Sequence, residues 1–150
     1  MEEDSELPIE KYMGKGESVL VVDDVQEQRE IASSMLMKLG YSVETVSSGE
    51  AAVEYMEQNS ADILVLDMIM TPGIDGLETY KRILEIHPGQ KAVVASGFSE
   101  TELVREAQRL GAGAYVKKPY LLKNIGPAIR RELDKYKGTR ENKNMNISAV

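Results

Sequence analysis

Acidic side chains follow two apolar runs of this 150-residue chain, and a lysine follows a third. Asp23 and Asp24 come after the apolar run at 19–22, Asp67 closes the apolar run at 63–66, and Lys118 follows the last apolar run. Clustered carboxylates repel and raise one another's pKa unless a cation neutralises them. Carboxylate oxygens are the ligands that Mg²⁺ prefers. The residues therefore predict an acidic Mg²⁺ pocket that holds one lysine.

Strands and helices that could bring these residues together alternate along the sequence. Uninterrupted apolar runs are typical of strands buried on both faces, and each is followed by a helical pattern. The expected strands are 18–23, 41–46, 62–67, 91–95 and 113–117. The expected helices are 25–39, 48–58, 76–86, 99–110 and 121–136. This alternation predicts an α/β fold, a doubly wound parallel sheet whose carboxyl ends line the ligand site.

The ends of the chain differ in composition from this alternating part. Residues 1–16 are acidic and contain Pro and Gly, which predicts an arm or linker. Residues 17–137 form the expected domain, and the polar, aperiodic residues 138–150 predict a flexible tail. Four segments resemble capping boxes that would start helices. They begin at Asp24, Ser47, Asp75 and Ser99.

Composition excludes several classes of function. The chain has no Cys, which excludes disulfides and thiolate chemistry and favours a reducing, cytoplasmic setting. With 25 acidic and 18 basic residues the net charge is −7, and no basic stripe with aromatics is present. Direct nucleic-acid binding is therefore not expected. We also find no apolar stretch of membrane-spanning length, so we expect no membrane partner.

Phosphoryl transfer is a reaction that this set of residues could support. An Asp beside a bound Mg²⁺ could attack phosphorus and become an aspartyl phosphate. Asp67 fits that role, and Lys118 would balance the added charge. Ser96, at the end of the fourth expected strand, could donate a hydrogen bond to a phosphoryl oxygen, and Gly97 beside it permits close approach of the backbone.

The residues and their order resemble the receiver domain of two-component response regulators. The resemblance covers residues 17–137 and rests on five motifs at strand ends. They are Asp23-Asp24, Asp67, Ser96-Gly97, Tyr115 and Lys118-Pro119. This resemblance implies a flavodoxin-like sheet of order 2-1-3-4-5 with five helices. Residues 70–76 and 97–119 also show a weaker similarity to the receiver modules of hybrid sensor kinases.

The resemblance also implies a role for each matching residue. Asp67 would accept the phosphoryl group from a phosphohistidine. Mg²⁺ would be held by Asp24, Asp67 and the main-chain carbonyl of Ile69, with Asp23 acting through a metal-bound water. Lys118, which directly precedes Pro119, would pair with the phosphoryl group in preference to Lys117.

Signalling would follow from a change in surface. Ser96 and Tyr115 would be the switch pair that reshapes residues 99–136. The implied partners are a histidine kinase or phosphotransfer protein and a downstream protein, and a homodimer is left open. Ile69 and Phe98 are apolar, which suggests a shielded and long-lived acyl phosphate. The protein would be a signalling domain with at most slow self-dephosphorylation.

Simpler interpretations exist for each residue alone. Asp24 could be a helix N-cap, Asp67 a solvated strand-end carboxylate, and Tyr115 a half-buried strand aromatic. Two other functions also stay open. An unmodified binding module would be expected to lack Asp67 or Lys118, and a phosphatase that forms an aspartyl phosphate would usually have an Asp where this chain has Ile69.

Overall fold

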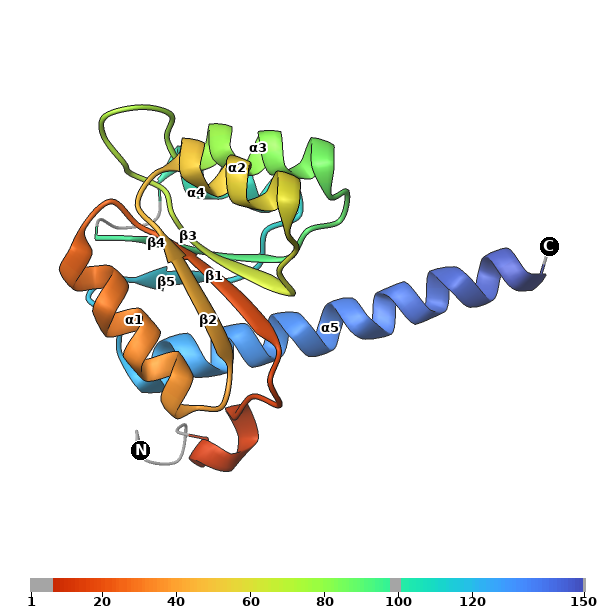
Figure 1. Ribbon diagram of the computed structural model, residues 1–150. Helices are drawn as coiled ribbons and strands as arrows, with labels where there is room; N and C mark the ends of the chain where they lie inside the picture. Colours follow the sequence, from red (N-terminus) through yellow and green to blue (C-terminus); the bar gives the residue numbers. More distant parts are fainter. Residues whose placement is uncertain (1–6, 98–100, 150) are drawn as a thin grey trace.

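A five-stranded parallel sheet forms the centre of the computed structural model, which describes residues 7–97 and 101–149, with side chains up to residue 135 (Figure 1). The strands are β1 (Ser18–Val22), β2 (Ser42–Val46), β3 (Ile63–Asp67), β4 (Ala92–Ser96) and β5 (Tyr115–Lys117). Their order is β2-β1-β3-β4-β5, and all neighbours pair in parallel. The predicted fold and strand order are confirmed.

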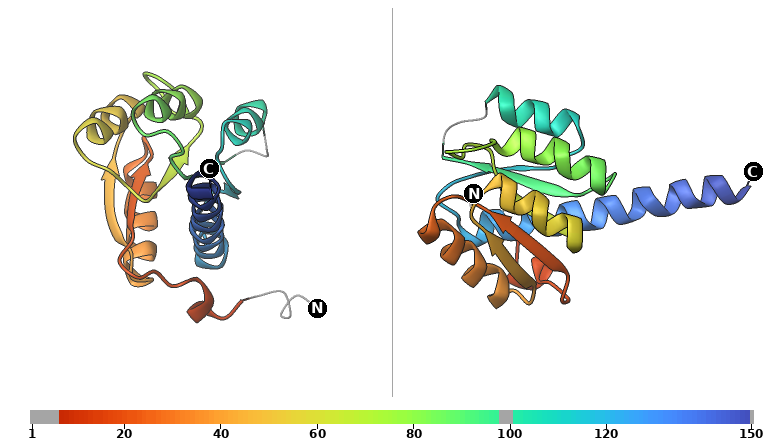
Figure 2. Two further views of the ribbon diagram at one scale, coloured as in Figure 1. Left: turned by 90° about the vertical axis from the view of Figure 1, so that its right-hand side faces the viewer. Right: turned by 45° about the horizontal axis from the view of Figure 1, so that its top comes forward.

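Helices cover both faces of this sheet. In the described part of the chain they are α1 (Gln26–Lys38), α2 (Gly49–Gln58), α3 (Gly76–Ile86), α4 (Glu102–Arg109) and α5 (Leu122–Ala149). One face carries α2, α3 and α4, and the other carries α1 and α5 (Figures 1 and 2). Such double coverage is the arrangement that right-handed βαβ crossovers produce in a doubly wound sheet.

The central strands are apolar along their whole length because both faces are buried. Val19 and Val21 of β1 belong to the core cluster beneath α1 and α5. Leu20 and Val22 belong to the cluster beneath α2, α3 and α4. All four are at most 1% exposed. Successive side chains therefore anchor opposite layers, and this fixes the register of the strand ends that bear the acidic residues.

Two helix starts use short polar side chains close to the predicted positions. Asp75 caps α3, and its carboxylate accepts a hydrogen bond from the backbone N–H of Glu78, as predicted. The cap of α2 is Ser48 and not Ser47, because the hydroxyl of Ser48 accepts from the N–H of Ala51. Only Ser47 has Glu50 three residues later, as a capping box requires, so the path of the backbone and not the sequence pattern selects Ser48 as the cap.

The other two predicted capping boxes are wrong or fall outside the described residues. Helix α1 has Val25 as its N-cap with no side-chain cap, and Asp24 instead accepts from the N–H of Thr71 at 3.4 Å. The cap of α4 is Thr101, whereas Ser99 lies outside the described residues. The side chain of Asp24 therefore contacts the loop that follows β3 and does not cap α1.

Helix α5 continues well past residue 136, where the sequence pattern predicted its end. It runs to Ala149 and projects beyond the sheet (Figure 1). The prediction ended the helix where apolar periodicity stops, and residues 137–149, which include Gly138 and three Asn, carry no sequence signal that favours its continuation. The helical prediction for 121–136 was therefore too short. Flexibility of 138–150 stays a prediction.

Part of the predicted N-terminal arm packs on the domain. Residues Ile9–Tyr12 form a short 3₁₀ helix beside α5, and Tyr12 is only 5% exposed. The hydroxyl of Tyr41 donates to the carbonyl of Tyr12 at 3.4 Å. A Cβ added at Gly126 of α5 would meet the Tyr12 ring, so the two surfaces are in close contact. The packed part of the chain therefore begins before residue 17.

Candidate functional site

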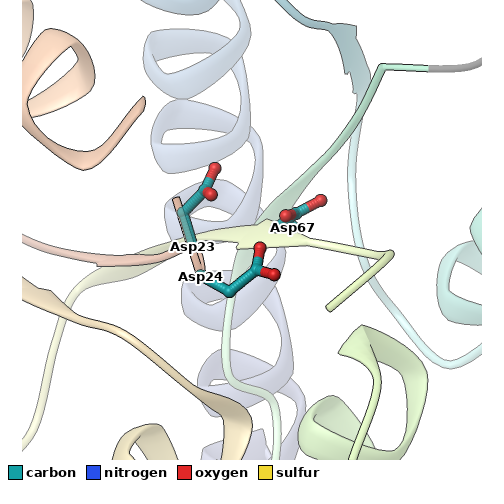
Figure 3. Close-up of side chains that lie close together, drawn as sticks. All are labelled: Asp23, Asp24 and Asp67. Atoms are coloured by element: carbon teal, nitrogen blue, oxygen red, sulfur yellow. The ribbon is translucent and has the colours of Figure 1, made fainter. Parts of the chain in front are cut away.

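Three aspartates meet at the carboxyl ends of β1 and β3. Asp23 and Asp24 follow β1 directly, and Asp67 is the last residue of β3 (Figure 3). One carboxylate oxygen from each lies within 4.8 Å of the others. Asp23 is fully buried and Asp67 is 2% exposed, whereas Asp24 is partly exposed. The predicted acidic cluster is therefore present at the sheet edge where α/β proteins bind ligands.

Lys118 places its ammonium group between two of these carboxylates. Its Nζ lies 2.9 Å from Oδ2 of Asp23 and 3.2 Å from Oδ2 of Asp67. The backbone N–H of Lys118 donates to the carbonyl of Ser96 at 2.8 Å, which ties this residue to the end of β4. The Lys118–Pro119 peptide bond is cis. The neighbouring Lys117 is exposed.

The charges of this cluster shift the pKa values of its members. Burial raises the pKa of Asp67 to about 6, and the negative charge of Asp23 adds to the increase against the opposing effect of Lys118. Burial alone would lower the pKa of Lys118, but its hydrogen bond to Asp23 and the charges of both aspartates outweigh burial and raise it. One buried lysine therefore does not fully compensate the carboxylates.

Several contacts to Asp23 were not predicted from the sequence. The N–H of Val25 donates to Oδ1 of Asp23 at 2.9 Å, and the guanidinium of Arg29 donates to its backbone carbonyl at 2.8 Å. The hydroxyl of Tyr120, a residue that is 2% exposed, lies 3.5 Å from Oδ2 of Asp23. The available signal for Tyr120 was its place directly after Lys118-Pro119, which puts it at the same sheet edge.

The loop after β3, residues 68–75, wraps around Asp67. The backbone N–H of Ile69 donates to Oδ1 of Asp67 at 3.3 Å, while the Ile69 side chain is 40% exposed. Where the loop ends, a Cβ added at Gly76 would lie 2.4 Å from the carbonyl oxygen of Asp67. Only glycine fits there, because α3 begins in contact with the end of β3. The loop thus holds Ile69 directly beside the acidic cluster.

Ser96 and Tyr115 occupy different places relative to this cluster. Ser96 is fully buried at the end of β4, next to Ala95, which pairs with Asp67 in the sheet register. Tyr115 pairs with Val94 at the start of β5, and its half-buried ring packs on the core cluster beneath α2, α3 and α4. Ser96 therefore borders the site, whereas Tyr115 lies one step further from it along the sheet.

The cluster has the donor set that a hard divalent cation requires. Its three carboxylates converge, and Asp24 keeps partial exposure on the open side. Mg²⁺ favours oxygen ligands, and its usual protein sites combine one or two carboxylates with waters. A divalent charge would also offset the burial and the charge of Asp23 that together raise the pKa of Asp67. The residues present therefore fit Mg²⁺.

Comparison with known proteins gives the family of the chain. Residues 19–130 match the response regulator receiver domain family, and this range covers all of the sheet except Ser18 and every residue of the acidic cluster. The chain belongs to this receiver domain family. Members of the family are phosphoacceptor signalling domains that work with histidine kinases or phosphotransfer proteins. This family assignment confirms the resemblance found in the sequence.

Relatives with established names agree with the assignment. The chain is 28% identical over 117 residues to sporulation initiation phosphotransferase F of Bacillus subtilis, covering 78% of this chain and 94% of the relative. It is 31% identical over 117 residues to the chemotaxis protein CheY of Thermotoga maritima, with coverage of 77% and 97%. Receiver similarity therefore extends over nearly the whole length of both relatives.

A solved structure shows the same fold in another receiver. It is the N-terminal domain of a response regulator/sensory box/GGDEF protein from Carboxydothermus hydrogenoformans, with a TM-score of 0.76 and 27% identity, covering 81% of this chain and 98% of that one. Within the described residues of our receiver, no helix is long and apolar enough to cross a membrane. The cytoplasmic location stays a prediction.

Proposed function

We propose that this receiver accepts a phosphoryl group on Asp67 from a phosphohistidine of a partner kinase or phosphotransfer protein. The observation that carries the proposal is the convergence of Asp23, Asp24 and Asp67 with Lys118 between two of them. Asp67 is the member at the end of β3, and Lys118 already contacts its carboxylate at 3.2 Å. Nucleophile and charge-balancing cation are therefore preassembled.

The reaction follows from the placement of these groups. A carboxylate oxygen of Asp67 forms the new bond to phosphorus while the bond from phosphorus to the donor imidazole nitrogen breaks, and the imidazole leaves with its electron pair. Lys118 and the N–H of Ile69 stabilise the negative charge that spreads over the phosphoryl oxygens. Mg²⁺, held by Asp24, Asp67 and the Ile69 carbonyl with Asp23 acting through a water, would supply further charge stabilisation.

The added group would change the surface that partners recognise. A phosphoryl group brings negative charge and strong acceptor oxygens to a site where Lys118 is shared with Asp23. We propose that the hydroxyl of Ser96 turns toward these oxygens, and that Tyr115 then moves inward. The surface of α4, β5 and α5 would be reshaped and would bind a downstream protein.

Intact mass spectrometry tests the proposal most directly. The protein is incubated with acetyl phosphate and Mg²⁺, and the matched variants are Asp67→Asn and Asp62→Asn. Asp62 precedes β3 at its opposite end and is exposed, so it controls for loss of an aspartate. We expect one hydroxylamine-labile phosphoryl adduct in the wild type and in Asp62→Asn, but none in Asp67→Asn or in a chelator. An adduct that persists in Asp67→Asn would contradict the assignment.

A further inference from the structure

Two carboxylates from other parts of the chain hold the loop 68–75, which carries Ile69. Oδ2 of Asp24 accepts a hydrogen bond from the N–H of Thr71 at 3.4 Å. Oε2 of Glu50 accepts from the N–H of Ile74 at 3.0 Å, and the pKa of Glu50 is lowered chiefly by this bond. Glu50 lies in the first turn of α2 and is not part of the acidic cluster.

The first turn of α2 fits closely against this loop. Gly73 has φ of +99°, and a Cβ added there would lie 2.7 Å from both carboxylate oxygens of Glu50. A Cβ added at Gly49 would lie 2.6 Å from Cγ1 of Ile74. Both glycines therefore allow the loop and the helix to approach, and Glu50 lies at their junction with its carboxylate on the loop backbone.

The two anchors of the loop differ in what Mg²⁺ would do to them. Asp24 belongs to the acidic cluster, so a cation would draw on the same carboxylate that accepts from Thr71. Glu50 does not belong to the acidic cluster, so a bound cation would leave its carboxylate free to accept from Ile74, and this hydrogen bond is the shorter of the two. We propose that Glu50 is a positioning residue that, through Ile74, holds this loop and keeps the Ile69 carbonyl in reach of the metal. The inference rests on the proposed function.

Two simpler roles of Glu50 would not involve the loop. Its negative charge in the first turn of α2 favours the helix dipole, and the same charge could attract a cation from a distance. Both alternatives depend on charge, whereas the proposed role depends on an acceptor oxygen at the right reach. Substitutions that separate charge from reach therefore distinguish them.

The test measures Mg²⁺ affinity of the full chain by isothermal titration calorimetry. Glu50→Asp keeps the charge but is one methylene too short to reach Ile74, and Glu50→Gln keeps the reach but loses the charge. Loss of a direct hydrogen-bond partner of a metal ligand typically weakens affinity about ten- to a hundredfold, and Glu50 acts on the Ile69 carbonyl only indirectly, through Ile74 and the loop. We expect Glu50→Asp to weaken Mg²⁺ binding about three- to tenfold, while Glu50→Gln stays within about twofold.

A control and a second measurement complete the design. Glu54→Asp changes the next exposed glutamate on α2, four residues further along, and should bind Mg²⁺ as the wild type does. Amide hydrogen exchange at Ile74 should accelerate in Glu50→Asp and not in Glu50→Gln. If Glu50→Gln loses more affinity than Glu50→Asp, or if Ile74 exchanges faster while affinity is unchanged, the inference is overturned.

The wild-type protein separates this inference from the proposed function. A wild type that neither binds Mg²⁺ nor forms the Asp67 adduct would overturn both. A wild type that does both, while Glu50→Asp binds Mg²⁺ with unchanged affinity, would overturn only the role of Glu50. Both glutamate variants keep a polar side chain on an exposed helix position, so we expect them to fold.

Discussion

The two ends of the sheet each gather charged side chains, but they balance them differently. At the amino end, Arg130 of α5 lies 3.0 Å from Glu17 and 2.9 Å from Asp134 beside an open cavity of about 600 Å³. At the carboxyl end, the buried carboxylates of Asp23 and Asp67 share Lys118. This cavity therefore lies away from the acidic cluster.

The pKa values of the carboxyl groups shift in opposite directions at the two ends. Burial alone would raise the pKa of Glu17, but hydrogen bonds from the N–H of Lys15 and from Arg130 lower it overall. For Asp67 the balance is reversed, because burial and the charge of Asp23 outweigh Lys118. A carboxyl group whose pKa is raised by burial in a crevice indicates a functional site, whereas a surface carboxylate that is paired with an arginine is usually structural.

The largest predicted difference between the two ends of the sheet is in the rate at which Asp67 is phosphorylated. Lys118→Met should slow formation of the Asp67 adduct about a hundredfold, because a preorganised charge that stabilises the transition state is lost. Arg130→Met removes the cation that pairs with Glu17 and Asp134 at the amino end and should leave the rate within about twofold. Rates are measured by mass spectrometry at fixed acetyl phosphate and Mg²⁺. Equal slowing in both variants would break the comparison.

The second effect concerns stability and pH in metal-free buffer. Asp67 has a folded pKa of about 6 against an ordinary 3.8, so the native state keeps a proton that the unfolded state loses between these values. Its contribution to the free energy of unfolding therefore falls as pH rises through that window, by about 3 kcal/mol. Urea unfolding with a chelator at pH 7 should show Asp67→Asn to be more stable than the wild type by a similar amount.

The difference in stability between the wild type and Asp67→Asn should decrease at low pH. Well below the unfolded pKa of 3.8 the Asp67 carboxyl is protonated in both states, and the stabilities of the wild type and Asp67→Asn should converge. Added Mg²⁺ should stabilise the wild type more than the variant, because a cation that binds only the native site raises its free energy of unfolding. A wild type that is more stable than Asp67→Asn at pH 7 without metal would contradict the charge argument.

Much of this arrangement could be predicted from the sequence because strand ends carry strong signals. An apolar run that closes on Asp67 and another that leads to Lys118 specify both buried strands and the edge where they end. The parallel order then brings the residues together whatever the loops do. The family resemblance added the role of each residue, which spacing alone does not reveal.

Other contacts depend on the path of loops and could not be predicted. Asp24 fits a capping box in the sequence, but the loop after β3 passes close enough to give it Thr71 as a partner. Glu50 and Tyr120 likewise reach the site across 24 and 97 residues of sequence, to Ile74 and Asp23. Contacts of this kind require the folded positions of two elements, which local pattern does not contain.

A third and smaller effect is expected on the lifetime of the phosphoryl group, from substitution of the apolar side chain of Ile69 beside the site. Ile69 is 40% exposed next to Asp67 and cannot orient a water, and the other predicted shield, Phe98, lies outside the described residues. We expect Ile69→Asn to speed loss of the phosphoryl group about tenfold, since a positioned proton acceptor typically contributes at least that much. The matched control is Ile86→Asn, which is 37% exposed and lines the amino-end cavity.

Decay of the purified phosphoprotein is followed by mass spectrometry after removal of acetyl phosphate. The control should decay at the wild-type rate, because its new amide lies at the wrong end of the sheet. A wild-type lifetime of seconds would show that Ile69 does not protect the phosphoryl group. Equal acceleration in both variants would point to a general loosening of the fold and would weaken the comparison between the two ends.

The smallest effect is expected at the amino end, from Glu17→Gln. Because the folded pKa of Glu17 is lowered, its carboxylate adds stability above the unfolded value of 4.5, and this is lost as pH falls through the folded pKa. The pair with Arg130 is partly exposed and screened, so the loss at pH 7 should not exceed about 1 kcal/mol and should shrink in high salt. Urea unfolding at two salt concentrations measures it. Phosphorylation should be unchanged, and a slower Asp67 reaction in this variant would mean that the two ends of the sheet are coupled.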